Sequence, residues 1–236
     1  MARYLIKFTK ENRMKYISHL DLLRLFQRSM KRASIRLSYS RGYNPHAKMG
    51  FAIPLSLGFE SQGEYMEIET DQTYEPAHIK KCLNEVLPQD LKVTFCSALK
   101  ETAKTALAAV LDYASYKLLF AGSRQAAEKL EQDVGPFLKQ EQILVVKYSK
   151  KKKKNTETDI RPMIHSITTV PVGHSTLFSV MLAAGSRSNL NPETMAEELC
   201  RFAGVAYERN QWSFQRMEMY YKEGKNNMIP LSGFGG

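Results

Sequence analysis

The order of strand-like and helix-like segments constrains the fold of this chain most, because the same order occurs twice along its 236 residues. Strand patterns in the first half lie at residues 3–9, 35–39, 51–55, 65–69 and 91–97. Those in the second half lie at residues 115–121, 143–148, 160–170, 176–183 and 212–221. Helical patterns lie between them at residues 18–33, 76–86, 123–139 and 192–202. This β-α-β-β-α-β order, with an extra strand in each half, predicts an α+β protein of two tandem ferredoxin-like units with antiparallel sheets.

An alanine-rich stretch at residues 100–111 separates the two halves, and we interpret it as a linker helix. We therefore predict an N-terminal domain over residues 1–104 and a second domain over residues 105–223. The remaining segment, residues 224–236, contains glycines and few apolar side chains, so we predict a flexible tail.

The chain has none of the patterns expected of a secreted or membrane protein. No apolar run approaches the roughly 18–20 residues that a membrane-spanning helix needs. The first residues have a charge within their short apolar stretch and lack a small-residue cleavage site, so we expect no secretory signal. Cys82, Cys96 and Cys200 are far apart and odd in number, which fits a reducing compartment rather than a disulfide framework. We therefore predict a cytoplasmic protein with no membrane contact.

Positive charge is concentrated in two places. The net charge is +10; residues 1–60 carry 12 basic and 3 acidic side chains, and residues 146–165 carry 7 and 2. Clustered positive charge indicates a polyanionic partner, nucleic acid above all, although a solvated basic surface is the alternative. The lysine run at residues 150–154 belongs to a segment, residues 150–158, that we interpret as a mobile hairpin loop able to add non-specific grip on RNA.

The predicted helix at residues 18–33 has one apolar and one basic face. Ser18 and Asp21 are expected to form a capping box at its start. The apolar face consists of Leu22, Phe26, Met30 and Ala33. The opposite side carries Arg24, Arg28, Lys31 and Arg32. Like charges one turn apart cost a few tenths of a kcal/mol, which a phosphate backbone would offset, so we predict that Arg24, Arg28 and Lys31 bind RNA phosphates. The alternative is a solvated face.

The turn after this helix mixes cations with aromatic and amide side chains. The RNA-binding residues that we predict there are Arg41, Tyr43, Asn44, His46 and Lys48. Cations can follow phosphates while aromatic faces stack on single-stranded bases. Tyr39 and Phe51 are instead interpreted as core or turn packing, which is also the alternative for Tyr43. Arg161 precedes Pro162, which holds its backbone extended, so we expect it either to bind RNA or to form a salt bridge between the halves.

His19, His46 and Glu64 are candidates for acid–base chemistry or metal binding. His19 and Asp21 diverge by about 200° on a helix and cannot share a metal, whereas His19, His46 and Glu64 could if the turn folds back. The alternative is structural: Asp21 completes the helix cap and the histidines bond to the turn backbone. The histidines lack zinc-site spacing and the cysteines are too scattered for an iron–sulfur cluster, so we predict no metal and no cofactor.

Two motifs resemble those of a radical-SAM-linked family, the uncharacterised DUF2344 proteins. The first runs from Ser18-His19-Leu20-Asp21 through spaced arginines to Gly42-Tyr43-Asn44-Pro45-His46, and the second is Asp159-Ile160-Arg161-Pro162. The resemblance extends over residues 2–222. It implies a partner, because in that family the domain is fused to, or encoded beside, a radical SAM protein with a cobalamin-binding region. It also suggests RNA or a ribosomal component as the substrate.

We interpret the chain as a non-catalytic RNA-binding accessory protein that presents an RNA or ribonucleoprotein substrate to a separate radical SAM enzyme. Two alternatives stay open. One is an RNA-processing or RNA-modifying enzyme with His19 or His46 as general acid–base. The other is a protein-interaction subunit of a radical SAM complex that makes no RNA contact.

Overall fold

The chain divides into two compact units. The computed structural model describes residues 1–100, 105–149, 154–224 and 227–235. The first unit comprises Met1–Asp112 together with Arg216–Gly236, and the second comprises Tyr113–Gln215. Each combines helices with antiparallel strand pairs, so the predicted α+β class is confirmed. The first unit is built from two stretches that are far apart in the sequence.

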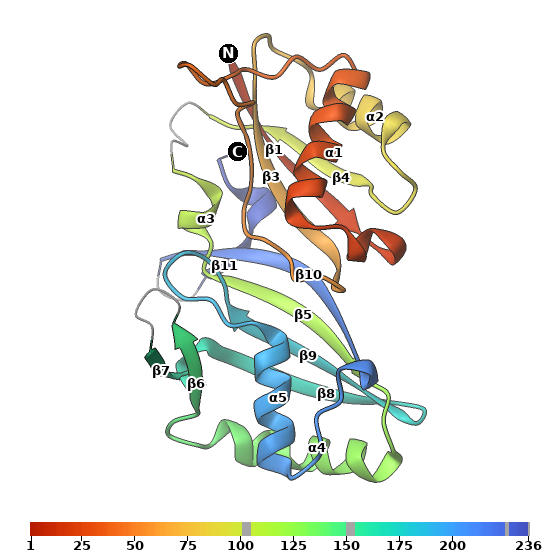
Figure 1. The fold of residues 1–236 in the computed structure, drawn as a ribbon, viewed down its shortest axis with the longest axis vertical. Coiled ribbons are helices and arrows are strands. Elements are labelled where there is room, and N and C mark those ends of the chain that lie inside the picture. The colour runs from red at the N-terminus through yellow and green to blue at the C-terminus, as the bar shows by residue number, and fades with distance from the viewer. Residues whose placement is uncertain (101–104, 150–153, 225–226, 236) are drawn as a thin grey trace. The chain divides into compact units, whose positions relative to one another are not determined.

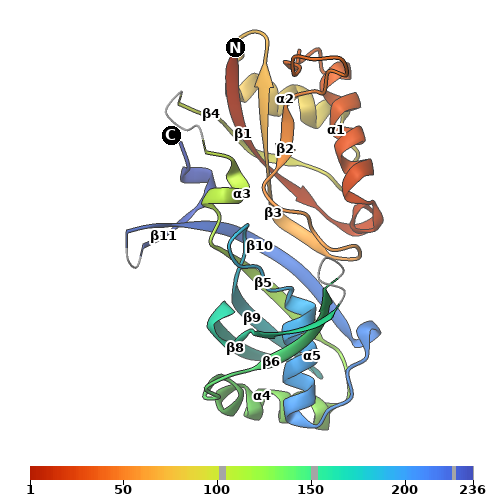
Figure 2. The same cartoon turned by 60° about the vertical axis from the view of Figure 1, so that its left-hand side comes forward.

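The sheet of the first unit has β1 (Ala2–Lys10) in its centre. It lies between β4 (Val93–Ala98) and β3 (Glu60–Thr70), antiparallel to both, and the short β2 (Met49–Phe51) pairs with β3. Two helices, α1 (His19–Arg32) and α2 (Pro76–Val86), lie over one face of this sheet (Figures 1 and 2). The core between sheet and helices includes Tyr4, Ile6, Phe8, Phe26, Met30, Met66, Ile79 and Leu83.

The C-terminal residues are part of the first unit. The strand β10 (Trp212–Glu223) enters this unit at Arg216 and turns back into β11 (Asn227–Pro230), with which it pairs antiparallel. A 3-10 helix at Leu231–Gly233 follows, and the Leu231 side chain is fully buried. A strand pairing and one buried leucine thus give secondary structure to residues 227–233, which lie within the stretch predicted as a flexible tail.

The second unit has a sheet in the order β5-β9-β8. The strands β5 (Tyr113–Phe120), β9 (Ser175–Ala183) and β8 (Ile164–Val172) are antiparallel neighbours, and a separate hairpin joins β6 (Leu144–Ser149) to β7 (Lys154–Asp159). The helices α4 (Arg124–Leu138) and α5 (Pro192–Ala203) contact each other and cover one face of the sheet (Figure 1). Their N-caps are Ser123 and Asn191, at the predicted helix starts.

Short helices occupy several connections. The 3-10 helices lie at Asn12–Tyr16, Arg161–Met163 and Arg209–Gln211, and the α-helical turn α3 lies at Leu107–Val110. The linker helix predicted at residues 100–111 is therefore wrong in length. Among the described residues of this stretch, only Leu107–Val110 are helical. Residues 101–104 lie outside the described part of the chain.

Three further local predictions are wrong. Residues 35–39 do not form a continuous strand, because only Leu37 and Tyr39 make isolated bridges, to Thr70 and Ala47. Residues 154–158, predicted as loop, belong to β7, where pairing with β6 overrides their polar composition. Residues 150–153 of the lysine run lie outside the described residues. Arg161 begins a 3-10 helix instead of an extended segment.

Candidate nucleic-acid interface

The helix α1 fixes the position of the predicted phosphate-binding residues. The Ser18 hydroxyl oxygen accepts a hydrogen bond from the Asp21 backbone N–H at 3.2 Å, and the same hydroxyl donates to the Asp21 carboxylate at 2.7 Å. This confirms Ser18 as the predicted cap, although the Asp21 carboxylate accepts from the Ser18 hydroxyl and not from the Ser18 backbone N–H as in a capping box. Leu22, Phe26 and Met30 are buried on the inner face. Because those three side chains anchor the helix to the core, its other face is held toward solvent.

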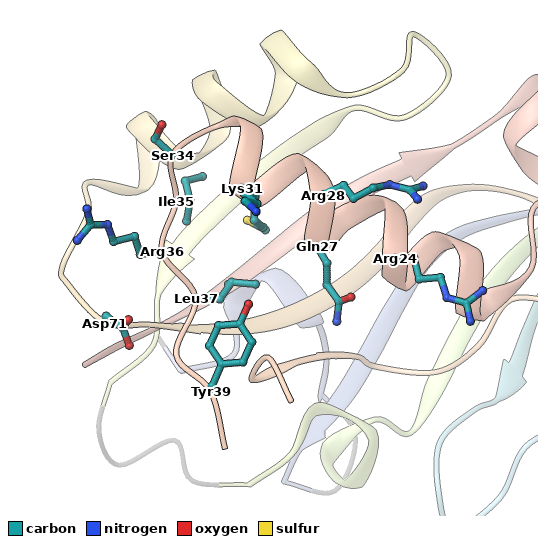
Figure 3. A pocket seen from close by; sticks show the side chains of 11 residues that line it. Arg24, Gln27, Arg28, Lys31, Ser34, Ile35, Arg36, Leu37, Tyr39 and Asp71 are labelled. Atoms are coloured by element: carbon teal, nitrogen blue, oxygen red, sulfur yellow. The ribbon is translucent and has the colours of Figure 1, made fainter. Parts of the chain in front are cut away.

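A groove of about 770 Å³ runs along α1 and the segment that follows it. We call it the basic groove; it is lined by Arg24, Gln27, Arg28, Met30, Lys31, Ser34, Ile35, Arg36, Leu37, Tyr39 and Asp71. Figure 3 shows the long polar side chains projecting from α1 and, beside them, Arg36, Leu37 and Tyr39 from the next segment. The buried side chains of Met30, Ile35 and Leu37 give the groove an apolar floor beneath its charged walls.

The basic groove is strongly positive. Of the described residues that line it, four are cationic and one, Asp71, is acidic. Within the described chain, Arg28, Lys31 and Arg36 form no ion pair. Arg24 lies 3.3 Å from Asp21, and both side chains are exposed, so water screens this pair. The hydrogen bond from Ser18, with help from Arg24, lowers the pKa of Asp21, and that carboxylate offsets only part of the local positive charge.

The turn residues predicted to bind RNA are exposed. Arg41, Tyr43, Asn44 and His46 all face solvent. The turn itself is fixed by two bonds between its arms: the Ser40 backbone N–H donates to the His46 carbonyl at 2.8 Å, and the His46 N–H donates to the Ser40 hydroxyl at 2.9 Å. These side chains are therefore available to a ligand on a backbone that is held in place.

Lys48, at the end of this turn, is less available. Its ammonium lies 2.6 Å from the Glu69 carboxylate, which is mostly buried. The pair lies at a second, smaller cavity of about 300 Å³ beside β2. Of the turn residues predicted to bind phosphate, Lys48 is thus the one whose charge a neighbouring acid already balances.

Glu64 forms a buried ion pair with Arg216, and this pairing differs from the suggested site with His19 and His46. Its carboxylate lies 2.8 Å from the Arg216 guanidinium, and each side chain is 4% exposed. Arg216 also donates to the Pro54 carbonyl, and the buried Lys10 ammonium donates to the Ile17 carbonyl. Burial lowers the pKa of Lys10, an effect that Glu64 opposes and Arg216 reinforces. Sequence patterns could not identify this cluster, because Arg216 is distant in the chain.

The two candidate histidines are both exposed. The His19 ring makes an edge-to-face contact with Phe51, with 5.2 Å between centroids, and His46 lies in the turn described above. Throughout the described residues, no group of three or more His, Cys, Asp or Glu side chains is arranged to hold a metal ion. The combination of His19, His46 and Glu64 considered from the sequence is therefore not assembled as a metal site here.

Arg161 has a structural setting in the second unit. Its guanidinium donates to the Leu138 carbonyl at 2.8 Å and to the Ile164 carbonyl at 3.2 Å. The Asp159 carboxylate accepts from the backbone N–H groups of Ile143 and Arg161. The Asp-Ile-Arg-Pro motif thus ties the end of α4 to β8, and this accounts for its residue types without a ligand.

The groove residues that were not among the predicted site residues include Gln27, Arg36 and Tyr39. Arg36 and Tyr39 lie in the segment read as a strand, and Tyr39, assigned to packing, is 59% exposed. In the sequence, the position of Arg36 between the apolar residues Ile35 and Leu37 indicates that its side chain faces solvent. A strand at residues 35–39 does not connect this residue to the basic face of α1, so the sequence alone does not place it in the groove.

Comparison with known proteins assigns a family but no activity. The family model for uncharacterized proteins conserved in bacteria, DUF2344, matches residues 3–192, and the chain therefore belongs to that family. None of the curated proteins compared with the sequence matches it. No helix within the described ranges has the length and hydropathy needed to span a membrane.

Two solved structures give distant likenesses. A crystal structure of a Cbf5–Nop10–Gar1 complex has a TM-score of 0.47 at 11% identity, over 92% of this chain and 48% of that chain. This chain thus spans about half the length of the matched one. A crystal structure of an unknown protein from Galdieria sulphuraria has a TM-score of 0.26 at 11% identity, over 91% of this chain and 98% of that chain. Neither likeness is close enough to assign a function.

Proposed function

We propose that this protein binds RNA through the basic groove. The observation that carries the proposal is the gathering of Arg24, Arg28, Lys31 and Arg36 around one groove whose only acid among the described lining residues is Asp71. Four exposed cations with so little compensation repel one another. A phosphate backbone relieves this repulsion and releases its own counterions, which makes a polyanion the favoured occupant.

The exposed turn extends the proposed surface. Arg41 and His46 supply further donors, and Tyr43 and Asn44 offer a ring and an amide to bases. Lys48, being paired with Glu69, contributes less, and Arg161 is engaged with backbone carbonyls. The proposal therefore rests on the first unit alone.

The wider role follows from the family resemblance. In this proposal the protein is a cytoplasmic, non-catalytic accessory that presents RNA or a ribonucleoprotein to a separate radical SAM enzyme and uses no cofactor of its own. We also interpret each unit as a variant of the ferredoxin-like arrangement; for the first unit this is supported by the strand order β4-β1-β3 with β2 beside β3, which is that of a β-α-β-β-α-β unit. This fold hosts many functions, so it supports no activity by itself.

Fluorescence anisotropy with labelled single-stranded RNA at several salt concentrations tests RNA binding. If about four phosphates are neutralised, the logarithm of affinity falls with the logarithm of salt concentration with a slope of about −3. Absence of binding at low salt, or binding indifferent to salt, would remove the proposal and favour a protein-interaction subunit. Turnover of a bound RNA by the isolated protein would favour the enzyme alternative.

A further inference from the structure

The basic groove contains more than positive charge. Its floor is apolar, formed by Met30, Ile35 and Leu37, which are 1%, 3% and 7% exposed. At one end lies Tyr39, whose side chain is 59% exposed. Unlike the other exposed aromatic residues of the described chain, this ring lines a groove with cationic walls. Single-stranded nucleic acids are bound by this combination, in which cations contact the phosphates and an aromatic face stacks on a base.

The backbone around Tyr39 is held firmly although its ring is open. The Ser38 N–H donates to the Glu69 carbonyl at 2.7 Å, and the Lys48 N–H donates to the Ser38 carbonyl at 2.8 Å. Tyr39 itself bridges to Ala47. A ligand that stacks on the ring thus meets a side chain on a fixed backbone, so binding does not have to order the backbone there.

The cations on α1 lie along one line. From Arg24 to Lys31 the helix rises by about 10 Å at about 1.5 Å per residue. That length equals about three phosphates at about 3.4 Å each along a stacked strand. A short run of nucleotides therefore matches the cationic wall, while Gln27, on the same helix and lining the same groove, can donate to or accept from a base edge (Figure 3).

We propose that the basic groove takes single-stranded RNA, with one unpaired nucleobase stacked on Tyr39 and the flanking phosphates on Arg28, Lys31 and Arg36. The inference rests on the proposed function and adds the strandedness of the RNA and the residue that selects it. In a duplex the base faces are stacked on their neighbours and cannot reach a ring in a groove. Stacking on an aromatic side chain tolerates any base, so the preference is for unpaired bases and not for a sequence.

The test uses the full chain and three labelled probes of equal length: single-stranded oligouridine, the same strand with abasic sugars, and an RNA duplex. At about 0.15 M salt, the physiological ionic strength, wild-type protein is expected to bind oligouridine more tightly than the other two probes. Tyr39→Ala should weaken that binding about 5- to 150-fold, the range measured for loss of one stacked base. Tyr39→Phe keeps the ring and should stay within about threefold of wild type.

Tyr16→Ala is the matched control, because Tyr16 is an exposed tyrosine of the same unit that does not line the basic groove. It should bind like wild type. Since Tyr39 carries no charge, Tyr39→Ala should leave the salt slope unchanged. Matching thermal unfolding midpoints for Tyr39→Ala and Tyr39→Phe would exclude misfolding as the cause of a lost affinity.

The outcomes separate the two proposals. If RNA binding depends on salt but Tyr39→Ala does not weaken it, the stacking inference is overturned and RNA binding remains. The same holds if the abasic strand or the duplex binds as tightly as oligouridine. If free uridine monophosphate competes with an affinity equal to that of oligouridine, the stacking inference is also overturned, because the occupant of the groove would then be a single nucleotide. Absence of binding to all three probes removes both proposals.

Discussion

Glu64→Gln removes the negative charge from the buried cluster of Lys10, Glu64 and Arg216 while keeping the size of the side chain. Glu64 and Arg216 are each 4% exposed and their atoms lie 2.8 Å apart, so no water can replace the lost charge. Breaking a buried pair by removing one partner costs about 3–5 kcal/mol. For a chain of this size the thermal midpoint should fall by about 6–20 °C, at about 2–4 °C per kcal/mol.

Thermal unfolding followed by circular dichroism measures this change. Glu69→Gln, on the same strand β3, is the control; its pair with Lys48 is partly exposed and should contribute about 0.2–1 kcal/mol. The double variant Glu64→Gln/Arg216→Gln should be less destabilised than the sum of the single variants, since the two side chains interact directly and either single variant already removes their ion pair. If Glu64→Gln shifts the midpoint no more than Glu69→Gln does, the argument from the buried ion pair is refuted.

Three further predictions concern the fold and the candidate histidine. Phe26→Ala should destabilise the protein by about 3–5 kcal/mol in urea unfolding, because the fully buried ring leaves a cavity beside Phe8; a loss below about 1 kcal/mol would mean that the faces of α1 are assigned wrongly. His46→Ala should lower RNA affinity and leave the fold intact, whereas an enzyme using His46 would keep its affinity and lose about 100-fold or more in rate. Burial, reinforced by a neighbouring carboxylate, raises the pKa of Cys200 to about 12, so the unfolded chain ionises first and the free energy of unfolding should fall as the pH rises from about 9 to 12. Urea unfolding at pH 8 and pH 10 should show a smaller fall for Cys200→Ala than for wild type; equal falls would show that this thiol does not contribute.

The helices were predictable because their signals are local. Capping residues at Ser18, Ser123 and Asn191 and apolar faces with helical period set α1, α4 and α5 without reference to the rest of the chain. Strand pairing is not local. The polar residues of β7 form a strand because β6 lies beside them, and the C-terminal segment is ordered because β10 pairs with β11 and Leu231 is buried.

The candidate site likewise has a part set by local sequence and a part set by contacts between distant residues. The basic face of α1 follows from helical spacing, so Arg24, Arg28 and Lys31 could be named from the sequence. The groove beside them could not, because it depends on how the chain crosses the sheet after Ser34, whose positive φ of 57° redirects the backbone. Glu64 is a candidate site residue from the sequence, but its partner Arg216 lies 152 residues away in the sequence and only the folded chain brings them together.

The salt dependence of RNA binding by Arg28→Ala/Lys31→Ala tests the central claim most directly. These two groove residues form no ion pair within the described chain, and alanine is a better helix former than either, so the fold should survive. Arg124→Ala/Lys129→Ala removes two exposed cations from α4 and controls for net charge. At about 0.7 per phosphate, the slope should fall in magnitude from about 3 to about 1.5 for the groove variant and stay at about 3 for the control. Equal slopes for wild type and both variants would contradict the account, because the phosphates would then be bound elsewhere.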